Sequence, residues 1–208
     1  VYSRPRGELR WEHVVVSLQG LLALPLAVGG RTALELQGYA HFLSREQREV
    51  HLYGRRSPPS WLDDVPVPAR FVFHRSPRLF PSDPPARGVT RLEESATQQE
   101  VAGAEALRSG LTFQPWGHGS WPLALSTPER AFLELLDEVP DRESFDHADK
   151  LMGGLLDLRP RHLQELLEAC QSVKVKRLFF FLADRHAFAW RRHLDRARVD
   201  LGKGKSML

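Results

Sequence analysis

The sequence of 208 residues has a single cysteine and no apolar run long enough to cross a membrane. Cys170 has no second cysteine to pair with, so an intrachain disulfide is excluded and we expect a protein of the reducing cytoplasm. The longest apolar run near the start, residues 21–28, falls short of the ~18 residues of a membrane span. No charged leader or cleavage site typical of a signal peptide accompanies it. We therefore predict no association with a membrane.

Several signatures of enzymes are also missing. Residues 204–206 (Gly-Lys-Ser) match the end of a phosphate-binding Walker A loop, but the first glycine is absent at the required spacing. No His-Glu-x-x-His or Gly-x-Ser-x-Gly motif occurs. Cys170 continues the apolar helical pattern of Leu163, Leu166 and Leu167, which favours core packing over a nucleophilic role. We predict no catalytic residue, no cofactor and no metal site, and hence no enzyme.

The first half of the sequence alternates between helical and extended patterns. Apolar residues at helical spacing predict an amphipathic helix over residues 11–24, ended by Pro25, and a second helix over about 31–40. Strict alternation predicts strands at residues 50–53, 70–74, 111–113 and 123–125. Proline-rich segments separate them, and residues 76–88 are expected to form a surface loop.

The second half reads as helical throughout. Ser126 and Glu129 have the spacing of a capping box, and a helix is expected to follow them. Further helices are predicted from about Ser144, from Pro160, and over a segment that carries buried residues from Val175 to Trp190. The predicted fold class is α/β (α+β), a mixed sheet with flanking helices followed by a C-terminal cluster of about four helices. A mixed part (11–125) and a helical part (126–208) are expected to pack as one body.

Charge is unevenly distributed along the chain, although the net charge is only +3. Residues 93–171 carry 6 Lys and Arg against 15 Asp and Glu, whereas residues 174–208 carry 10 against 3. Basic side chains at helical multiples could contact nucleic acid or another polyanion; alternatively, they close on the acidic middle of the same chain. The candidate contact residues are Lys174, Lys176, Arg177, Arg185, Arg191, Arg192, Arg196 and Arg198.

A glycine pair opens the second predicted helix. Gly29 and Gly30 are followed by the hydroxyl residue Thr32, an arrangement similar to that with which nucleotidyltransferases approach a triphosphate. Those enzymes place a pair of carboxylates about ten residues later to hold two metal ions. Here residues 40–46 contain no aspartate pair. We interpret Gly29, Gly30 and Thr32 as a structural turn; the alternative is a degenerate or active nucleotidyltransferase-like nucleotide-binding protein.

Four blocks of the sequence resemble the AbiEi antitoxins of bacterial type IV toxin–antitoxin systems. They keep the order of that family: "AVGGRTALELQGYAHFL", "STPERAFLELLDEVP", "LRPRHLQELLEACQSVKVKRLFFFLADRHAFAW" and "VDLGKGKSML". The glycine pair lies in the first block and serves as a marker of the family.

The resemblance implies an autoregulating transcriptional repressor that acts in abortive infection against phage. In this family an N-terminal winged helix-turn-helix binds promoter DNA, and a C-terminal domain counteracts an AbiEii-type nucleotidyltransferase toxin without a stable complex. Residues 1–10 resemble the last wing strand and linker, so we expect the winged domain itself to lie outside this sequence. The resemblance carries over no catalytic residue.

Overall fold

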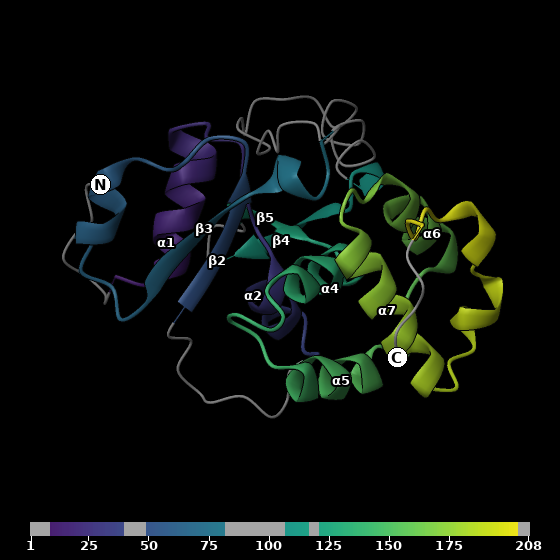
Figure 1. Cartoon of the computed structure of the whole chain (residues 1–208). Helices are drawn as coiled ribbons and strands as arrows, with labels where there is room; N and C mark the ends of the chain where they lie inside the picture. Colours follow the sequence, from purple (N-terminus) through teal and green to yellow (C-terminus); the bar gives the residue numbers. More distant parts are fainter. Residues whose placement is uncertain (1–8, 40–48, 82–106, 117–120, 204–208) are drawn as a thin grey trace.

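The computed structural model describes residues 9–39, 49–81, 107–116 and 121–203 (Figure 1). Its elements in chain order are the helix α1 (Trp11–Val16), the π-helical turn η1 (Ser17–Leu21), β1 (Leu26–Val28), α2 (Gly30–Leu36), β2 (Glu49–Gly54), the 3-10 turn η2 (Ser60–Asp64), β3 (Arg70–Arg75), the 3-10 turn η3 (Ser76–Arg78), β4 (Leu111–Trp116), β5 (Trp121–Ser126), α4 (Pro128–Asp137), α5 (Phe145–Gly154), α6 (Pro160–Ala169), α7 (Val173–Arg185), and the 3-10 turns η4 (Trp190–His193) and η5 (Arg196–Arg198).

The five strands form one mixed sheet in the order β3-β2-β1-β5-β4. β1 is antiparallel to β2 and parallel to β5, while β2 and β3 run parallel and β4 and β5 antiparallel. α1 and η1 pack on one side of this sheet, and α2 and α4 pack on the other (Figure 1). The four strands expected from alternation are confirmed, and each extends beyond its predicted core by one or more residues.

A buried glutamine joins β1 to β5. β1 has only three residues and matches β5 in register at a single pair, Val28 and Leu125. Gln19 bridges the gap: its Nε2 donates to the carbonyls of Leu26 (3.1 Å) and Ala124 (2.9 Å). Its Oε1 accepts the Ala124 N–H (2.9 Å). The side chain therefore makes the hydrogen bonds that a longer β1 backbone would make.

The predicted helices are present, with one wrong start signal. α5 begins behind Ser144, whose hydroxyl accepts the His147 N–H, and α6 begins at Pro160, as the sequence indicates. The predicted capping box of Ser126 and Glu129 does not form, because Ser126 belongs to β5 and α4 begins one residue later, after Thr127. The Glu129 carboxylate instead accepts hydrogen bonds from the backbone and guanidinium of Arg159.

The last predicted helix is shorter than its apolar pattern suggests. α7 ends at Arg185, and Trp190 lies on the separate turn η4. Trp190 is nevertheless buried, and its Nε1 donates to the Leu155 carbonyl (2.8 Å). The apolar pattern correctly identified a core residue but assigned it to the wrong element, because the chain turns and brings Trp190 back over Phe179.

α4 is the helix around which the second half of the chain is built. Its apolar stripe, Ala131, Phe132, Leu135 and Leu136, is fully buried, and α2, β5, α5, α6 and α7 all contact it. The fold class expected from the sequence is thus confirmed, a mixed sheet with flanking helices followed by the helices α4 to α7. The division between residues 125 and 126 remains a proposal. Among the described residues, none of the helices has the length and apolar character needed to span a bilayer.

We predict that Gln19→Leu lowers the free energy of unfolding by about 2–3 kcal/mol, because it leaves the N–H and carbonyl of Ala124 and the carbonyl of Leu26 without their partner. Urea unfolding followed by circular dichroism measures this change. Gln171→Leu is the matched control, since Gln171 is exposed; it should alter stability by less than about 0.5 kcal/mol. Equal effects of the two substitutions would contradict the bridging role.

Candidate functional site

The glycine pair forms the turn between β1 and α2. Gly29 is extended, and its N–H donates to the His51 carbonyl of β2 (3.0 Å). Gly30 opens α2 with a φ of +52°, in the left-handed region that favours glycine. The N–H of Gly30 then points to α4, where it donates to Oε2 of Glu134 (2.9 Å). In a nucleotidyltransferase the backbone N–H groups of such a turn would bind phosphate. Here the N–H of Gly30 binds the carboxylate of Glu134 from the same protein.

Both glycines are required by close packing. A Cβ on Gly29 would lie 2.4 Å from Oε2 of Glu134 and 2.4 Å from Cδ2 of Tyr53. A Cβ on Gly30 would lie 2.9 Å from the Tyr53 hydroxyl. Both the Glu134 carboxylate and the Tyr53 ring are buried, so neither can move aside into solvent. The pair is therefore explained by the close approach of α2, β2 and α4.

Arg130 balances the charge of Glu134. Its Nε donates to Oε1 of Glu134 (2.8 Å), and one Nη donates to the Ser109 carbonyl (2.7 Å). The guanidinium also lies over the ring of Phe80, 4.7 Å from the ring centre. Both charged side chains are at least 98% buried. The sequence pattern does not predict this buried pair, since an Arg and a Glu four residues apart on a helix usually indicate a surface ion pair.

Thr32 ties the same turn to β2. Its hydroxyl oxygen accepts the His51 N–H (3.0 Å), and the hydroxyl lies 3.4 Å from the Glu49 carbonyl to which it donates. Thr32 is completely buried. All three residues of the predicted turn thus lie together, and each contacts structural groups of the protein.

A chain of titratable side chains crosses β2 and β3 beside this turn. His51 Nδ1 lies 2.9 Å from His74 Nε2, and His74 Nδ1 lies 3.2 Å from Oε1 of Glu138 at the end of α4. Tyr53 stacks on His74, and the Tyr53 hydroxyl is buried without a hydrogen-bond partner among the described residues. The sequence signal for this row of titratable side chains is the alternation of polar residues at 49, 51 and 53. This spacing places all three on one face of β2.

The electrostatics of this chain follow from its burial. Burial, helped by the neighbouring His74, lowers the pKa of His51 from 6.5 to about 4, so this ring is neutral at physiological pH. Burial alone would raise the pKa of Glu138, but the hydrogen bond and charge of His74 outweigh it and lower that pKa. The cavity beside them measures about 20 Å³, which is room for one water-sized group and far below the several hundred Å³ of a ligand site.

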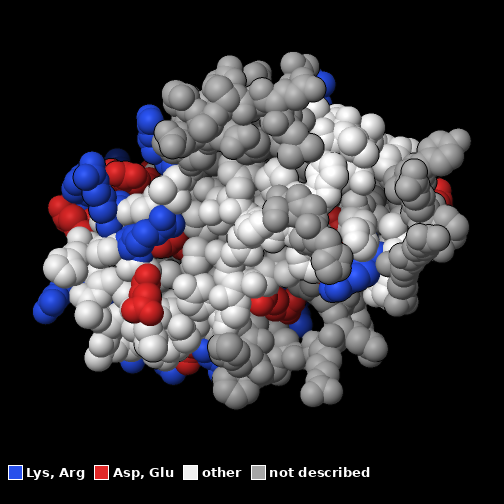
Figure 2. Space-filling view, turned by 180° about the vertical axis from the view of Figure 1, so that it is seen from behind, with Lys and Arg blue, Asp and Glu red and all other residues white. Residues whose placement is uncertain are grey.

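The eight basic residues predicted to contact a polyanion lie in the helical half of the protein. In Figure 2 basic and acidic side chains alternate on the left side, which carries this half. Three of the eight pair with the acidic middle of the chain: Arg185 with Asp149, Arg198 with Glu168 and Lys174 with Asp137. Lys174 also donates to the carbonyls of Asp137 and Val139.

The other five are held within the C-terminal segment itself or are buried. Arg191 and Arg196 both bind Asp184, and their guanidinium groups lie over the ring of Phe180. Arg177 donates to the carbonyls of Leu201 and Gly202. Lys176 is only 4% exposed. Arg192 is exposed and lies beside His193. Most of these charges are compensated inside the protein, so contact with a polyanion would have to compete with existing ion pairs.

No part of the described chain gathers metal ligands. Among the residues that the structure describes, no three His, Cys, Asp or Glu side chains are grouped so that they could hold an ion. Cys170 is buried, and burial raises the pKa of its thiol. Residues 40–46, where the sequence lacks an aspartate pair, and residues 204–206, which match the end of a Walker A loop, lie outside the described residues.

Two protein-family models match this chain and together cover nearly all of it. The model described as "Transcriptional regulator, AbiEi antitoxin, Type IV TA system" matches residues 47–208. The model described as "Transcriptional regulator, AbiEi antitoxin N-terminal domain" matches residues 1–45. The protein is therefore of the class of transcriptional regulators that serve as antitoxins. The chain belongs to the AbiEi antitoxin family of type IV toxin–antitoxin systems, which confirms the resemblance seen in the sequence. No curated protein and no solved structure matches it.

The boundary between the two family models passes through the sheet. α1, β1 and α2 fall in the part matched by the N-terminal model, and β2, β3, β4 and β5 fall in the other. β1 is the central strand and pairs with β2 and β5 across that boundary. The described residues of both matches thus contribute to one sheet.

We predict opposite effects for two Gly→Ala substitutions. Gly29→Ala should lower the free energy of unfolding by about 1–3 kcal/mol or more, because the new methyl group overlaps Glu134 and Tyr53. Gly20→Ala meets no atom within 4 Å and should raise stability by up to about 1 kcal/mol. Thermal unfolding of the two variants measures both. If Gly29→Ala were as stable as the parent, the close approach would be wrong.

We predict that stability falls as the pH drops from about 6.5 towards 4. In this window the unfolded chain protonates His51 and the folded chain does not, so the unfolded state binds more protons and gains free energy. The contribution is about 2–3 kcal/mol. Urea unfolding at several pH values in this range gives the free energy of unfolding as a function of pH. This free energy should depend less steeply on pH in His51→Asn than in the parent. His193→Asn, at an exposed ring, is the control; a pH dependence unchanged by His51→Asn would contradict the assignment.

Proposed function

We propose that this chain carries the antitoxin function of an autoregulating repressor and counteracts a nucleotidyltransferase toxin of the AbiEii type. The observation that carries the proposal is the match of both AbiEi models, over residues 1–45 and 47–208. The chain acts without catalysis of its own and without forming a stable complex with the toxin, as the family resemblance implies.

The glycine turn supports a non-enzymatic role. A phosphate at the start of α2 would meet the Glu134 carboxylate, which already accepts the Gly30 N–H. Two negative charges at one site repel each other, and the buried carboxylate is held in place by Arg130. These contacts favour a structural turn over the alternative of nucleotide binding.

Promoter recognition is assigned to the winged helix-turn-helix of the family, not to the described residues. The basic set around α7 is a weaker candidate for DNA contact, because four of its arginines are engaged with Asp149, Glu168 and Asp184. We propose that repression needs the winged domain and that the antitoxin effect does not.

Co-expression tests both parts of this proposal in one strain. The chain is produced with the nucleotidyltransferase toxin encoded beside it, and the strain carries a reporter gene under the operon promoter. The reference strain produces a toxin variant that lacks its metal-binding carboxylates. We expect the chain to restore growth close to the rate of this reference strain, while the reporter stays active. A chain extended by a complete winged domain should restore growth and also repress the reporter.

Two controls make the outcome interpretable. Immunoblotting establishes that the chain accumulates, and affinity purification of a tagged chain should recover no toxin after washing. Persistent growth arrest despite full accumulation would refute the antitoxin function. Recovery of the toxin in equal amounts would refute the absence of a stable complex.

A further inference from the structure

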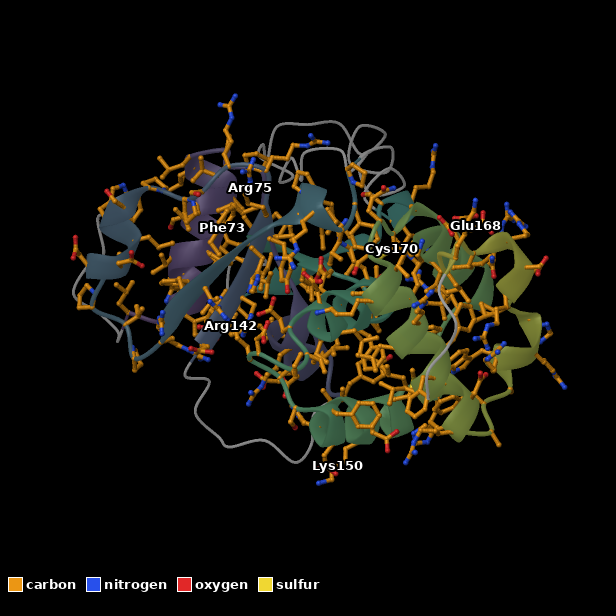
Figure 3. All side chains as sticks on the ribbon, in the orientation of Figure 1. Phe73, Arg75, Arg142, Lys150, Glu168 and Cys170 are labelled. Carbon is orange, nitrogen blue, oxygen red and sulfur yellow. The ribbon has the colours of Figure 1, made fainter. Side chains whose placement is uncertain are left out.

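The strand β3 forms one edge of the sheet. It pairs with β2 alone, and within the described ranges no backbone group bonds to its outer side. An edge strand presents a row of N–H and carbonyl groups that can pair with another extended chain. In Figure 3 this edge, marked by Phe73 and Arg75, lies far from Glu168 and Cys170 of the helical half.

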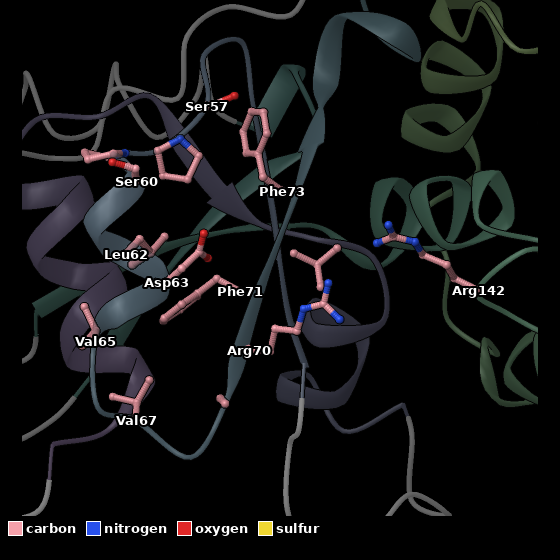
Figure 4. A pocket seen from close by; sticks show the side chains of 14 residues that line it. Ser57, Ser60, Leu62, Asp63, Val65, Val67, Arg70, Phe71, Phe73 and Arg142 are labelled. Carbon is pink, nitrogen blue, oxygen red and sulfur yellow. The ribbon is translucent and has the colours of Figure 1, made fainter.

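A hollow of about 710 Å³ accompanies this edge strand. Its lining comes from three places: the segment 57–67, which includes η2; residues 69–73, at and just before the start of β3; and Arg142, beyond the end of α4. Figure 4 shows the strand passing through the middle of the lining, with η2 on one side and Arg142 on the other. The hollow thus reaches both faces of the strand.

The two faces differ in chemistry. Phe71 and Phe73 are half-buried on the side of η2, where Leu62, Val65 and Val67 add to an apolar wall. On the other side Arg70 and Arg142 have side chains that are 75% and 54% exposed. Their contacts with Glu49 (3.8 Å) and Glu138 (3.7 Å) are long, and both guanidinium groups have further N–H donors with which to bind another carboxylate.

We propose that the β3 edge binds an extended protein segment in which apolar and acidic side chains alternate. A strand added to a sheet edge places successive side chains on opposite faces. Apolar residues of such a segment would meet Phe71 and Phe73, and acidic residues would meet Arg70 and Arg142. The two faces of β3 thus favour a segment with this alternating pattern. The proposed binding does not depend on the proposed antitoxin function.

Pairing with a second copy of β3 fits this edge less well. In an antiparallel pair related by a two-fold axis and centred on Val72, Arg70 would stand opposite His74. Opposite charges across a strand pair stabilise it, and β3 has no acidic residue to place opposite Arg70. The charge of the edge therefore favours an acidic partner over self-association.

Fluorescence polarisation with labelled peptides of about eight residues, roughly the length of a strand, tests the proposal on the full chain. The probe is an alternating Val-Glu peptide; the comparison peptides alternate Val with Lys, or carry the same Val and Glu in two blocks. We expect saturable binding of the alternating Val-Glu peptide, and binding at least about tenfold weaker for both comparison peptides. Equal binding of the three peptides would overturn the proposal.

Charge reversal locates the site. Arg70→Glu combined with Arg142→Glu should weaken the alternating Val-Glu peptide at least about tenfold. Arg161→Glu, on an α6 side chain that is 94% exposed, should leave its affinity unchanged. Because the three arginines are exposed, circular dichroism is expected to show intact folding. Unchanged affinity of the double variant would overturn the assignment.

Hydrogen exchange on the unmodified chain provides a measurement that needs no variant. Adding the alternating Val-Glu peptide should slow exchange of amides in residues 70–75, and the exchange of β4 amides should stay unchanged. The absence of saturable binding up to about 1 mM, a very weak affinity, would reject the proposal. Slow exchange of the amides of residues 70–75 before the peptide is added, together with a dimer in sedimentation, would overturn the proposal. It would show that β3 pairs with a second copy of itself.

Discussion

The buried ion pair between Arg130 and Glu134 is the interaction on which much of this structure depends. Glu134 accepts the N–H of Gly30 and fixes the start of α2, while Arg130 reaches the Ser109 carbonyl ahead of β4. One pair thus joins α4 to two distant segments of the chain. Taking two charges out of water is expensive, and removing one partner of such a pair typically destabilises a protein by about 3–5 kcal/mol. The surrounding hydrogen bonds and the Phe80 ring are what make the burial tolerable.

This pair also explains why the sequence resembles a phosphate-binding turn. The start of a helix attracts negative charge whether it belongs to a nucleotide or to a side chain of the protein. The requirement for glycine is likewise the same, since the anion must approach the backbone closely. Gly29 and Gly30 meet both conditions with Glu134 as the anion. The motif therefore reports the close approach of an anion, and only the fold tells which anion it is.

The uneven charge of the sequence is largely resolved within the molecule. Arginines of the basic C-terminal segment reach Asp149 and Glu168 of the acidic middle, and Asp184 engages two more. The chain remains positively charged overall, at +3, and exposed arginines remain at the β3 edge. The surface that the structure points to as a partner site is therefore not the one with the highest density of basic residues in the sequence.

The sequence by itself determined the predicted helices, four of the five described strands and the family, because periodicity and ordered blocks are local properties; it missed the three-residue strand β1. It placed α5 and α6 correctly and found Trp190 as a core residue, though on the wrong element. Only the tertiary structure decided what Gly30 contacts, since Glu134 stands 104 residues away in the sequence. The same holds for the bridge made by Gln19 and for the chain from His51 to Glu138, which join elements that no local pattern relates. Hydrogen bonds and charges between such elements depend on how the strands are ordered in the sheet, and the sequence pattern leaves that order open.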